Sequence, residues 1–247
     1  MIPVQEKYRS QIEALVLLSK KKGYLNQEQI IEAFGKVPLS PEEFDQISGV
    51  LKQNGIAIRV KSQLQEWIES IVIAFILAMF IRTFFIQAFK IPSGSMRPTL
   101  LEGDRLMVNK LRYGARVPFT KKRLPGMSKP KRGDIIVFVF PGDPKRDFIK
   151  RLIAFGGERV EIRDGDIFIN GENVEDPVVK NIFYYNRGDY GSMEESVLVP
   201  EGYVYVLGDN SGSSHDSRFW GFVPQENIIG RAEFIYWPFD RMRFLQQ

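Results

Sequence analysis

The chain has 247 residues, of which 44% are hydrophobic and 13% aromatic, enough for one sizeable domain plus a smaller one and too apolar for a disordered chain. It has no cysteine and one histidine, His215, which excludes disulfides, a thiol nucleophile, zinc sites built on cysteine and any site that needs two histidines. With 34 Lys and Arg against 30 Asp and Glu, the formal net charge is +4.

The positive charge is concentrated in one short stretch. Residues 110–132 hold nine basic side chains and no acidic one, whereas residues 133–247 hold 12 basic and 19 acidic side chains, a balance of −7. Such a stretch is either a solvated loop or a contact to anionic lipid head groups, at ~1 kcal/mol for each basic residue. It contains no interleaved aromatics and no groove-reading motif, so we expect no nucleic-acid partner.

Residues 1–61 carry helical patterns and predict a small all-α domain. Apolar residues at helical spacing predict a first helix over residues 5–21. Asn26 to Gln29 resembles a capping box at the start of a second helix, and Ser40 to Glu43 gives a stronger start signal for a third. The pattern is similar to the small helical region at the N-terminus of primary sigma factors. This resemblance points to a cytoplasmic partner of residues 1–61, whose identity is unknown.

The segment from Ser70 to Phe89 predicts a membrane-spanning helix. Sixteen of its twenty residues are apolar, and twenty helical residues span ~30 Å, the hydrocarbon thickness of a bilayer. Arg82 opposes insertion by at most about 3.5 kcal/mol, less than the roughly 4 to 7 kcal/mol contributed by the Ile, Val, Leu and Phe residues. A buried helix of a soluble protein is the alternative. We expect an uncleaved signal-anchor over residues 66–89, and the flanking charges leave its orientation open.

Residues 90–247 predict a mainly β domain, antiparallel and barrel-like or sandwiched. IIVFVF at 135–140 is typical of a buried strand, and YVYVLG at 203–208 of another. VEIRDGDIFING at 160–171 predicts a hairpin that turns at Asp164-Gly165. No long helix is expected in this region, so strands pack against strands.

Two serines, Ser93 and Ser95, lie in IPSGSMRPTL directly after the predicted span, where Pro and Gly favour an irregular, exposed loop. A serine nucleophile needs a base. His215 is one candidate. Lys150 is another, because an amine buried in apolar surroundings can lose its proton near neutral pH. Taken alone, each of these residues fits an ordinary surface position better than a catalytic one.

Lys150 and Arg151 are neighbours in the predicted strand FIKRLI, so their side chains face opposite sides. If Lys150 faces the interior, Arg151 can remain in water. Further along, GDNSGSSHDSRFWGFVP at 208–224 contains acidic and basic side chains that could form an ion-pair network. A pair of carboxylates acting as general acid and base is the rival interpretation of the same segment.

Together these segments resemble the bacterial type I signal peptidases, membrane serine proteases with a Ser-Lys dyad. The span is followed by PSGSMRPTL, and the family's other motifs come in order: GDRLMVNKLRYG at 103–114, RGDIIVF at 132–138, FIKRLIAFGGERVEI at 148–162 and the segment 208–224. The resemblance covers about residues 66 to 240.

The resemblance implies roles for individual residues. Ser95 would be the nucleophile, Lys150 the general base, and Ser93 would donate its hydroxyl to the oxyanion hole beside the backbone N–H of Ser95. Ser214 would orient Lys150 through a hydrogen bond. Structural support would come from four charged residues: Asp209, Asp216, Arg218 and Arg151.

The resemblance also implies a location and a substrate. It places the β domain outside the bacterial cytoplasmic membrane, anchored by a single span, and residues 1–61 in the cytoplasm. Its substrates would be secreted precursors with small residues at positions −1 and −3 of the cleavage site, and it would need no metal ion or organic cofactor. Two departures stand out: Ser211-Gly212-Ser213 where the family often has Arg-Asp-Asn, and Gly156 where Pro is frequent.

Two other functions share part of this pattern. A self-cleaving repressor uses the same Ser-Lys chemistry and has an N-terminal helical domain, but such proteins are soluble and bind DNA. An inactive, membrane-anchored scaffold is the second. The predicted span and the segment 208–224 oppose the repressor, and the joint presence of Ser93, Ser95, Lys150 and Ser214 opposes the scaffold.

Overall fold

The structure is a computed structural model that describes residues 8–22, 24–35, 40–59, 63–117, 120, 122–192 and 195–246. The chain divides into two compact units, one up to Ile76 and one from Leu77. Three features named in the sequence analysis lie outside the described residues: the start of the first helix at Gln5, the domain end at residue 61 and the basic residue Lys121.

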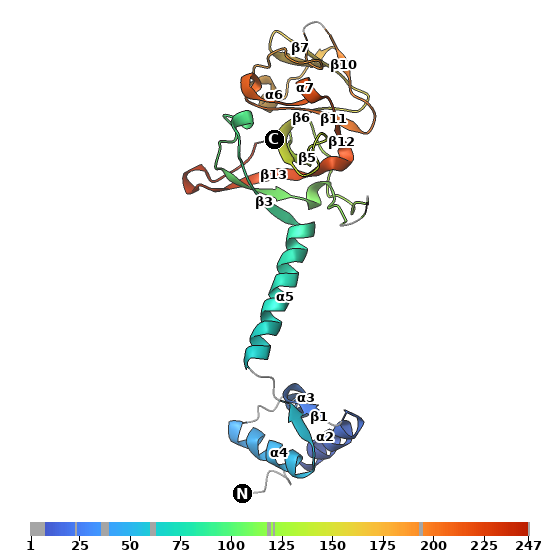
Figure 1. The fold of residues 1–247 in the computed structure, drawn as a ribbon, viewed down its shortest axis with the longest axis vertical. Helices are drawn as coiled ribbons and strands as arrows, with labels where there is room; N and C mark the ends of the chain where they lie inside the picture. Colours follow the sequence, from blue (N-terminus) through green and yellow to red (C-terminus); the bar gives the residue numbers. More distant parts are fainter. Residues whose placement is uncertain are drawn as a thin grey trace. The chain divides into compact units, whose positions relative to one another are not determined.

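The first unit contains the three predicted helices. They are α2 (Arg9–Lys22), α3 (Gln27–Ala33) and α4 (Pro41–Gln53), labelled in Figure 1. Both predicted capping boxes form. The Ser40 hydroxyl accepts a hydrogen bond from the Glu43 N–H at 3.2 Å, the Glu43 carboxylate accepts one from the Ser40 N–H at 3.1 Å, and Gln29 accepts one from the Asn26 N–H at 3.0 Å.

Two short strands complete this unit and were not predicted. β1 (Tyr24–Asn26) and β2 (Ala57–Arg59) pair in parallel. Each has three residues, and their pairing depends on contacts across more than 30 positions of sequence, so no local pattern indicates it. The core of the unit is formed by fully buried side chains from the helices and β1: Leu25, Ile30, Ile47 and Leu51.

Helix α5 (Gln63–Phe84) is long and apolar enough over Leu64–Phe84 to cross a membrane, and its most apolar window is not buried by other parts of the described chain. The helix ends five residues earlier than predicted. Ile86–Lys90 forms strand β3, which pairs with β4 (Arg105–Asn109). Apolar composition continues across this boundary, so hydropathy could not indicate where the backbone changes from helix to strand.

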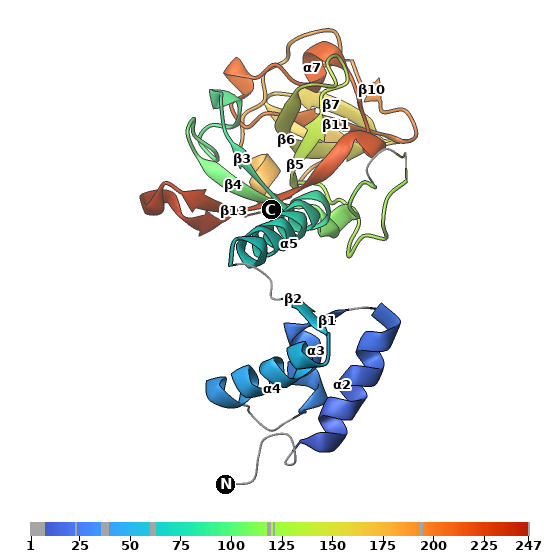
Figure 2. The ribbon, with the colours of Figure 1, turned by 60° about the horizontal axis from the view of Figure 1, so that its bottom comes forward.

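The second unit contains an eight-stranded antiparallel sheet that curls, as Figure 2 shows. Its order is β12-β11-β6-β5-β13-β4-β3, with β14 paired to β13. The remaining strands of this sheet are β5 (Ile135–Val139), β6 (Asp147–Phe155), β11 (Tyr203–Leu207), β12 (Val223–Pro224), β13 (Ile228–Trp237) and β14 (Arg243–Phe244). The predicted barrel-like antiparallel domain is confirmed.

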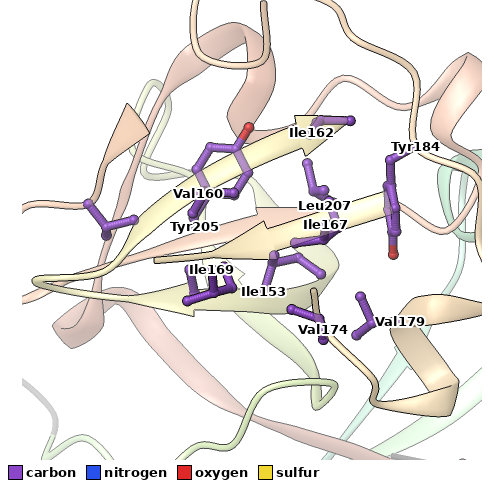
Figure 3. Packing of buried hydrophobic residues seen from close by; sticks show 12 residues of the cluster. Ile153, Val160, Ile162, Ile167, Ile169, Val174, Val179, Tyr184, Tyr205 and Leu207 are labelled. Atoms are coloured by element: carbon purple, nitrogen blue, oxygen red, sulfur yellow. The ribbon is translucent and has the colours of Figure 1, made fainter. Parts of the chain in front are cut away.

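A smaller antiparallel sheet packs against this one. Its strands, in spatial order, are β10 (Val197–Leu198), β7 (Arg159–Arg163), β8 (Asp166–Ile169) and β9 (Glu172–Asn173). The predicted hairpin turn forms between β7 and β8, with positive φ at Asp164 (53°) and Gly165 (88°), as a type I′ turn requires. Figure 3 shows Val160 and Ile167 of the small sheet facing Ile153 and Leu207 of the large one, which together form a core.

Only short helices occur elsewhere in the described part of this unit. The α-helical turns are α6 (Pro177–Lys180) and α7 (Ser217–Trp220), and the 3₁₀ turns are η1 (Gly94–Met96), η2 (Leu111–Tyr113), η3 (Ser211–Ser213), η4 (Gln225–Asn227) and η5 (Phe239–Arg241). Two of these turns, η1 and η3, carry residues of the candidate site, where irregular backbone is positioned by the rigid sheet.

Candidate active site

Ser95 and Lys150 meet in the structure although 55 positions separate them. Lys150 lies in the middle of β6, and its Nζ is 2.6 Å from the Ser95 Oγ. Ser95 lies in η1, which follows directly after the first strand of the sheet. The same Nζ donates to the carbonyl oxygen of Ile149 at 3.0 Å. A hydroxyl and an amine at this distance can exchange a proton directly.

The surroundings of Lys150 favour its neutral form. The side chain is 4% exposed, and burial lowers its pKa from 10.5 to about 8, although Asp216 and Asp209 partly oppose the shift. The aromatic ring of Phe148, 5.6 Å from the Lys150 Nζ, favours the charged form as well, so burial is the cause of the net shift. Near neutral pH an appreciable fraction of Lys150 is therefore able to accept a proton.

Asn210 fixes the loop that carries Ser95. Its backbone N–H donates to the Ser95 carbonyl at 3.0 Å, and its side-chain amide donates to the Gly94 carbonyl at 2.9 Å. Gly208 allows this close approach, because a Cβ there would overlap both the Ser214 hydroxyl and the Ser95 carbonyl. Asn210 lies within the segment 208–224, but no role for it was predicted, because a polar residue in a Gly- and Asp-rich loop is the only signal in the sequence.

The dyad opens onto a cleft of about 740 Å³. Ser93 lines it, is exposed, and makes no hydrogen bond within the described part of the chain. His215 also lines the cleft, but its ring packs against Phe219 with centroids 5.1 Å apart, and the partner of the Ser95 hydroxyl is Lys150. The geometry thus favours Lys150 over His215 as the base.

Ser214 is buried beside the dyad without the predicted hydrogen bond. Its side chain is 5% exposed, and its Oγ has no partner among the described residues. Lys150 directs its hydrogen bonds to Ser95 and to the Ile149 carbonyl instead. A buried hydroxyl without a partner is costly, and no described residue satisfies the Ser214 hydroxyl.

Arg151 is buried, so the expectation that it remains in water is wrong. It is 2% exposed and forms a bidentate ion pair with Asp209, with N–O distances of 2.8 and 2.6 Å. Thr99 donates a further hydrogen bond to the same carboxylate. Both faces of β6 at this point are covered by protein, and Asp209, 58 residues away, supplies the opposite charge that makes burial of a guanidinium tolerable.

Arg218 and Asp216 form a second buried ion pair, which confirms the predicted network. Both side chains are fully buried, and two guanidinium nitrogens lie 2.8 Å from the carboxylate oxygens. Arg218 also donates to the hydroxyl of Ser211 at 2.7 Å and to its carbonyl at 2.9 Å. Ser211, the first residue of the departure from the family pattern, is therefore part of this network.

The described residues contain no group of three His, Cys, Asp or Glu side chains placed as metal ligands. The two buried carboxylates, Asp209 and Asp216, are each occupied by an arginine. A role for them as a general acid and base pair therefore has no geometric support.

The chain is similar in sequence to known proteins. Residues 64–237 match the family "Signal peptidase, peptidase S26". A signal peptidase I of Pseudomonas fluorescens is 34% identical over 68% of this chain and 72% of its own length, and that of Leptolyngbya laminosa is 38% identical over 74% and 85%. A crystal structure of a signal peptidase I from Enterococcus faecalis has 38% identity and a TM-score of 0.35, covering 42% of this chain and 96% of that one.

The N-terminal region has a separate similarity. Residues 6–69 match "Sigma-70 factor, region 1.1", as the helical pattern indicated. The comparisons support neither of the alternatives, the self-cleaving repressor or the inactive scaffold.

Proposed function

This chain belongs to the signal peptidase family, peptidase S26, and from that membership we propose that it removes signal peptides from secreted precursor proteins with Ser95 as nucleophile and Lys150 as general base. The observation that carries the residue assignment is the 2.6 Å contact between the Ser95 hydroxyl and a buried lysine whose pKa is lowered to about 8.

The reaction begins with transfer of the Ser95 hydroxyl proton to the lone pair of neutral Lys150. The Ser95 oxygen attacks the carbonyl carbon of residue −1, and the oxyanion accepts hydrogen bonds from the Ser95 N–H and the Ser93 hydroxyl. Protonated Lys150 returns its proton to the leaving amine, and the mature protein departs. Water, deprotonated by Lys150, then hydrolyses the acyl-enzyme.

Ser214 positions Lys150 in this proposal. A neutral amine has two N–H groups and one lone pair. The lone pair faces Ser95 and one N–H is bonded to the Ile149 carbonyl, which leaves the second N–H available to the unpartnered hydroxyl of Ser214. The two buried ion pairs, Arg151–Asp209 and Arg218–Asp216, hold β6 and the segment 208–224 around the dyad.

The substrate segment is bound in extended form along strand edges beside the cleft, with small residues at −1 and −3. α5 anchors the chain in the cytoplasmic membrane by one span, with residues 1–61 in the cytoplasm and the β unit outside. The basic stretch 110–132 contacts anionic lipid head groups. The resemblance of the N-terminal region to a sigma-factor region leaves its cytoplasmic partner to be identified.

The function is tested with purified full-length protein in detergent and a precursor that carries an Ala-x-Ala site. We expect one cut, located by N-terminal sequencing of the mature product directly after the second Ala. A precursor with Phe at both positions is the matched control and should remain uncut. Cleavage at other positions, or equal cleavage of the Phe precursor, would contradict the assignment.

The rate of cleavage should rise with pH. Only the deprotonated form of Lys150 acts as a base, so below its pKa of about 8 the value of kcat/KM falls by about tenfold for each pH unit. A pH series from 5.5 to 9.5 under limiting substrate measures this. A profile that is flat across pH 7 to 8.5 would exclude titration of the base in that range.

Replacing Ser93 by alanine removes one donor of the oxyanion hole. We expect kcat to fall by roughly 100- to 1,000-fold with little change in KM, since the bond forms only when charge develops on the oxygen. Ser93→Thr retains the hydroxyl and should restore most of the rate. Equal losses in the two variants would instead indicate that the position matters for packing.

A further inference from the structure

A second pocket lies at the C-terminal end of α5, apart from the cleft with the dyad. Its volume is about 420 Å³, within the roughly 300 to 1,000 Å³ typical of small-molecule sites. Three basic side chains line it: Arg82 from α5, Lys110 at the end of β4, and Arg116. No acidic residue lines it. This composition selects an anionic ligand.

Lys110 offsets the negative partial charge at the C-terminus of α5, which would otherwise repel an anion. Its Nζ donates to the carbonyl oxygens of Arg82 at 2.9 Å and Thr83 at 3.3 Å, the last carbonyls of the helix, which would otherwise repel negative charge. An ammonium group has three N–H donors, so one remains for a ligand. Its backbone N–H, bonded to the Phe85 carbonyl at 2.8 Å, fixes its position.

Arg82 and Arg116 are exposed, and no carboxylate of the described residues forms an ion pair with either. Asp147 acts electrostatically on Lys110 and Arg116 without pairing, so the three basic groups and this one carboxylate leave a local charge of +2.

Other arginines of the stretch 110–132 already have carboxylate or carbonyl partners within the protein. Arg112 pairs with Glu233 at 3.0 Å, Arg132 pairs with Glu158 at 2.8 Å, and Arg123 donates to backbone carbonyls. In the pocket, by contrast, the guanidinium of Arg116 and one N–H of Lys110 can bind an external anion.

The location of the pocket identifies the ligand further. Arg82 lies in the last turn of the apolar helix α5, so in a membrane-spanning α5 it is level with the lipid head groups. The pocket is also lined by apolar side chains, Met79, Val139 and Ile229, suited to contact the glycerol backbone or the start of an acyl chain. A free phosphate ion would use only the basic groups.

We propose that this pocket binds the phosphate of an anionic phospholipid, with Arg82, Lys110 and Arg116 as donors and the apolar wall against the lipid chain. The chemistry shared with free phosphate is recognition of a phosphoryl oxygen by charged donors. The inference deepens the lipid contact given under the proposed function, since it names a binding site for one lipid, and it rests on α5 crossing the membrane.

Native mass spectrometry of the full-length protein in detergent, titrated with phosphatidylglycerol, tests the proposal. Arg82→Gln and Arg116→Gln should each weaken binding about fivefold, from ~1 kcal/mol for each basic group at an anionic lipid, and the double variant roughly 25-fold. Arg105→Gln, an exposed arginine outside both the pocket and the basic stretch, should change binding less than about twofold.

Further measurements distinguish a lipid phosphate from a free phosphate ion, and distinguish the lipid site from the catalytic assignment. Phosphatidylcholine should bind more weakly than phosphatidylglycerol, and 10 mM inorganic phosphate should not displace the lipid. Displacement by phosphate would overturn the lipid assignment, and equal weakening by pocket and control variants would overturn the site. Ser95→Ala should bind the lipid like the wild type, so a failure of the catalytic assignment leaves this result intact.

Discussion

Replacing Ser95 by alanine or Lys150 by methionine will reduce precursor cleavage by about 10⁴-fold or more. Ser95 supplies the attacking oxygen, and the Lys150 Nζ, 2.6 Å away, is the proton acceptor that the structure brings to it. Residues that act as one unit in covalent catalysis lose nearly the whole rate when either is removed. Methionine keeps the apolar stem and the volume of lysine, so the Lys150 variant removes the base with little cavity formation.

The measurement is precursor cleavage under single-turnover conditions, with circular dichroism as the check on folding. Lys145→Met is the matched control, because Lys145 is an exposed lysine in the turn that precedes β6, and it should keep its full rate. An active Lys150→Met variant would direct the search for the base to His215, which lines the same cleft. The double variant should be no slower than the slower single variant.

Arg218→Met will destabilise the β unit by about 3 to 5 kcal/mol. Arg218 and Asp216 are both fully buried, so the substitution leaves a carboxylate without its charged partner in the interior. The Ser211 hydroxyl and carbonyl also lose a donor each. Urea unfolding followed by tryptophan fluorescence measures the free energy, since Trp220 lies in α7, the same turn as Arg218.

Two companion variants separate charge burial from loss of packing. Arg163→Met breaks an exposed pair with Glu161 and should cost under about 1 kcal/mol. The double variant Arg218→Met/Asp216→Leu should be more stable than Arg218→Met alone, because it removes the unpaired charge. A double variant as unstable as the sum of the two single variants would show that the pair contributes only independent packing.

Local signals predicted the elements whose determinants lie close together in sequence. The capping box at Ser40 and Glu43 marks the start of α4, and the hairpin at Asp164-Gly165 follows from residues that tolerate positive φ. The end of α5 and the strand β3 were missed because both are apolar. Pairing with β4 decides the backbone of residues 86–90, and that information lies some 20 positions further along the chain.

The difference between local signals and long-range contacts also applies to the active site. Alternation along β6 indicated that Lys150 and Arg151 face opposite sides, but the second buried face could not be predicted, because it is created by Asp209 from a distant loop. The contact between Ser95 and Lys150 depends on how β6 and η1 pack in three dimensions. From residue types alone, both His215 and Lys150 were candidates for the general base. The ordered motifs of the family pointed to Lys150.

The central claim, covalent catalysis by Ser95, is tested most directly by capturing the acyl-enzyme. The full-length protein is mixed with an Ala-x-Ala precursor, the reaction is stopped with acid within the first turnover, and peptide mass spectrometry locates the modified residue. We expect an ester between the signal peptide's C-terminal carbonyl and the Ser95 oxygen, absent from Ser95→Ala. An ester on another residue, or processing at an unchanged rate in Ser95→Ala, would contradict it.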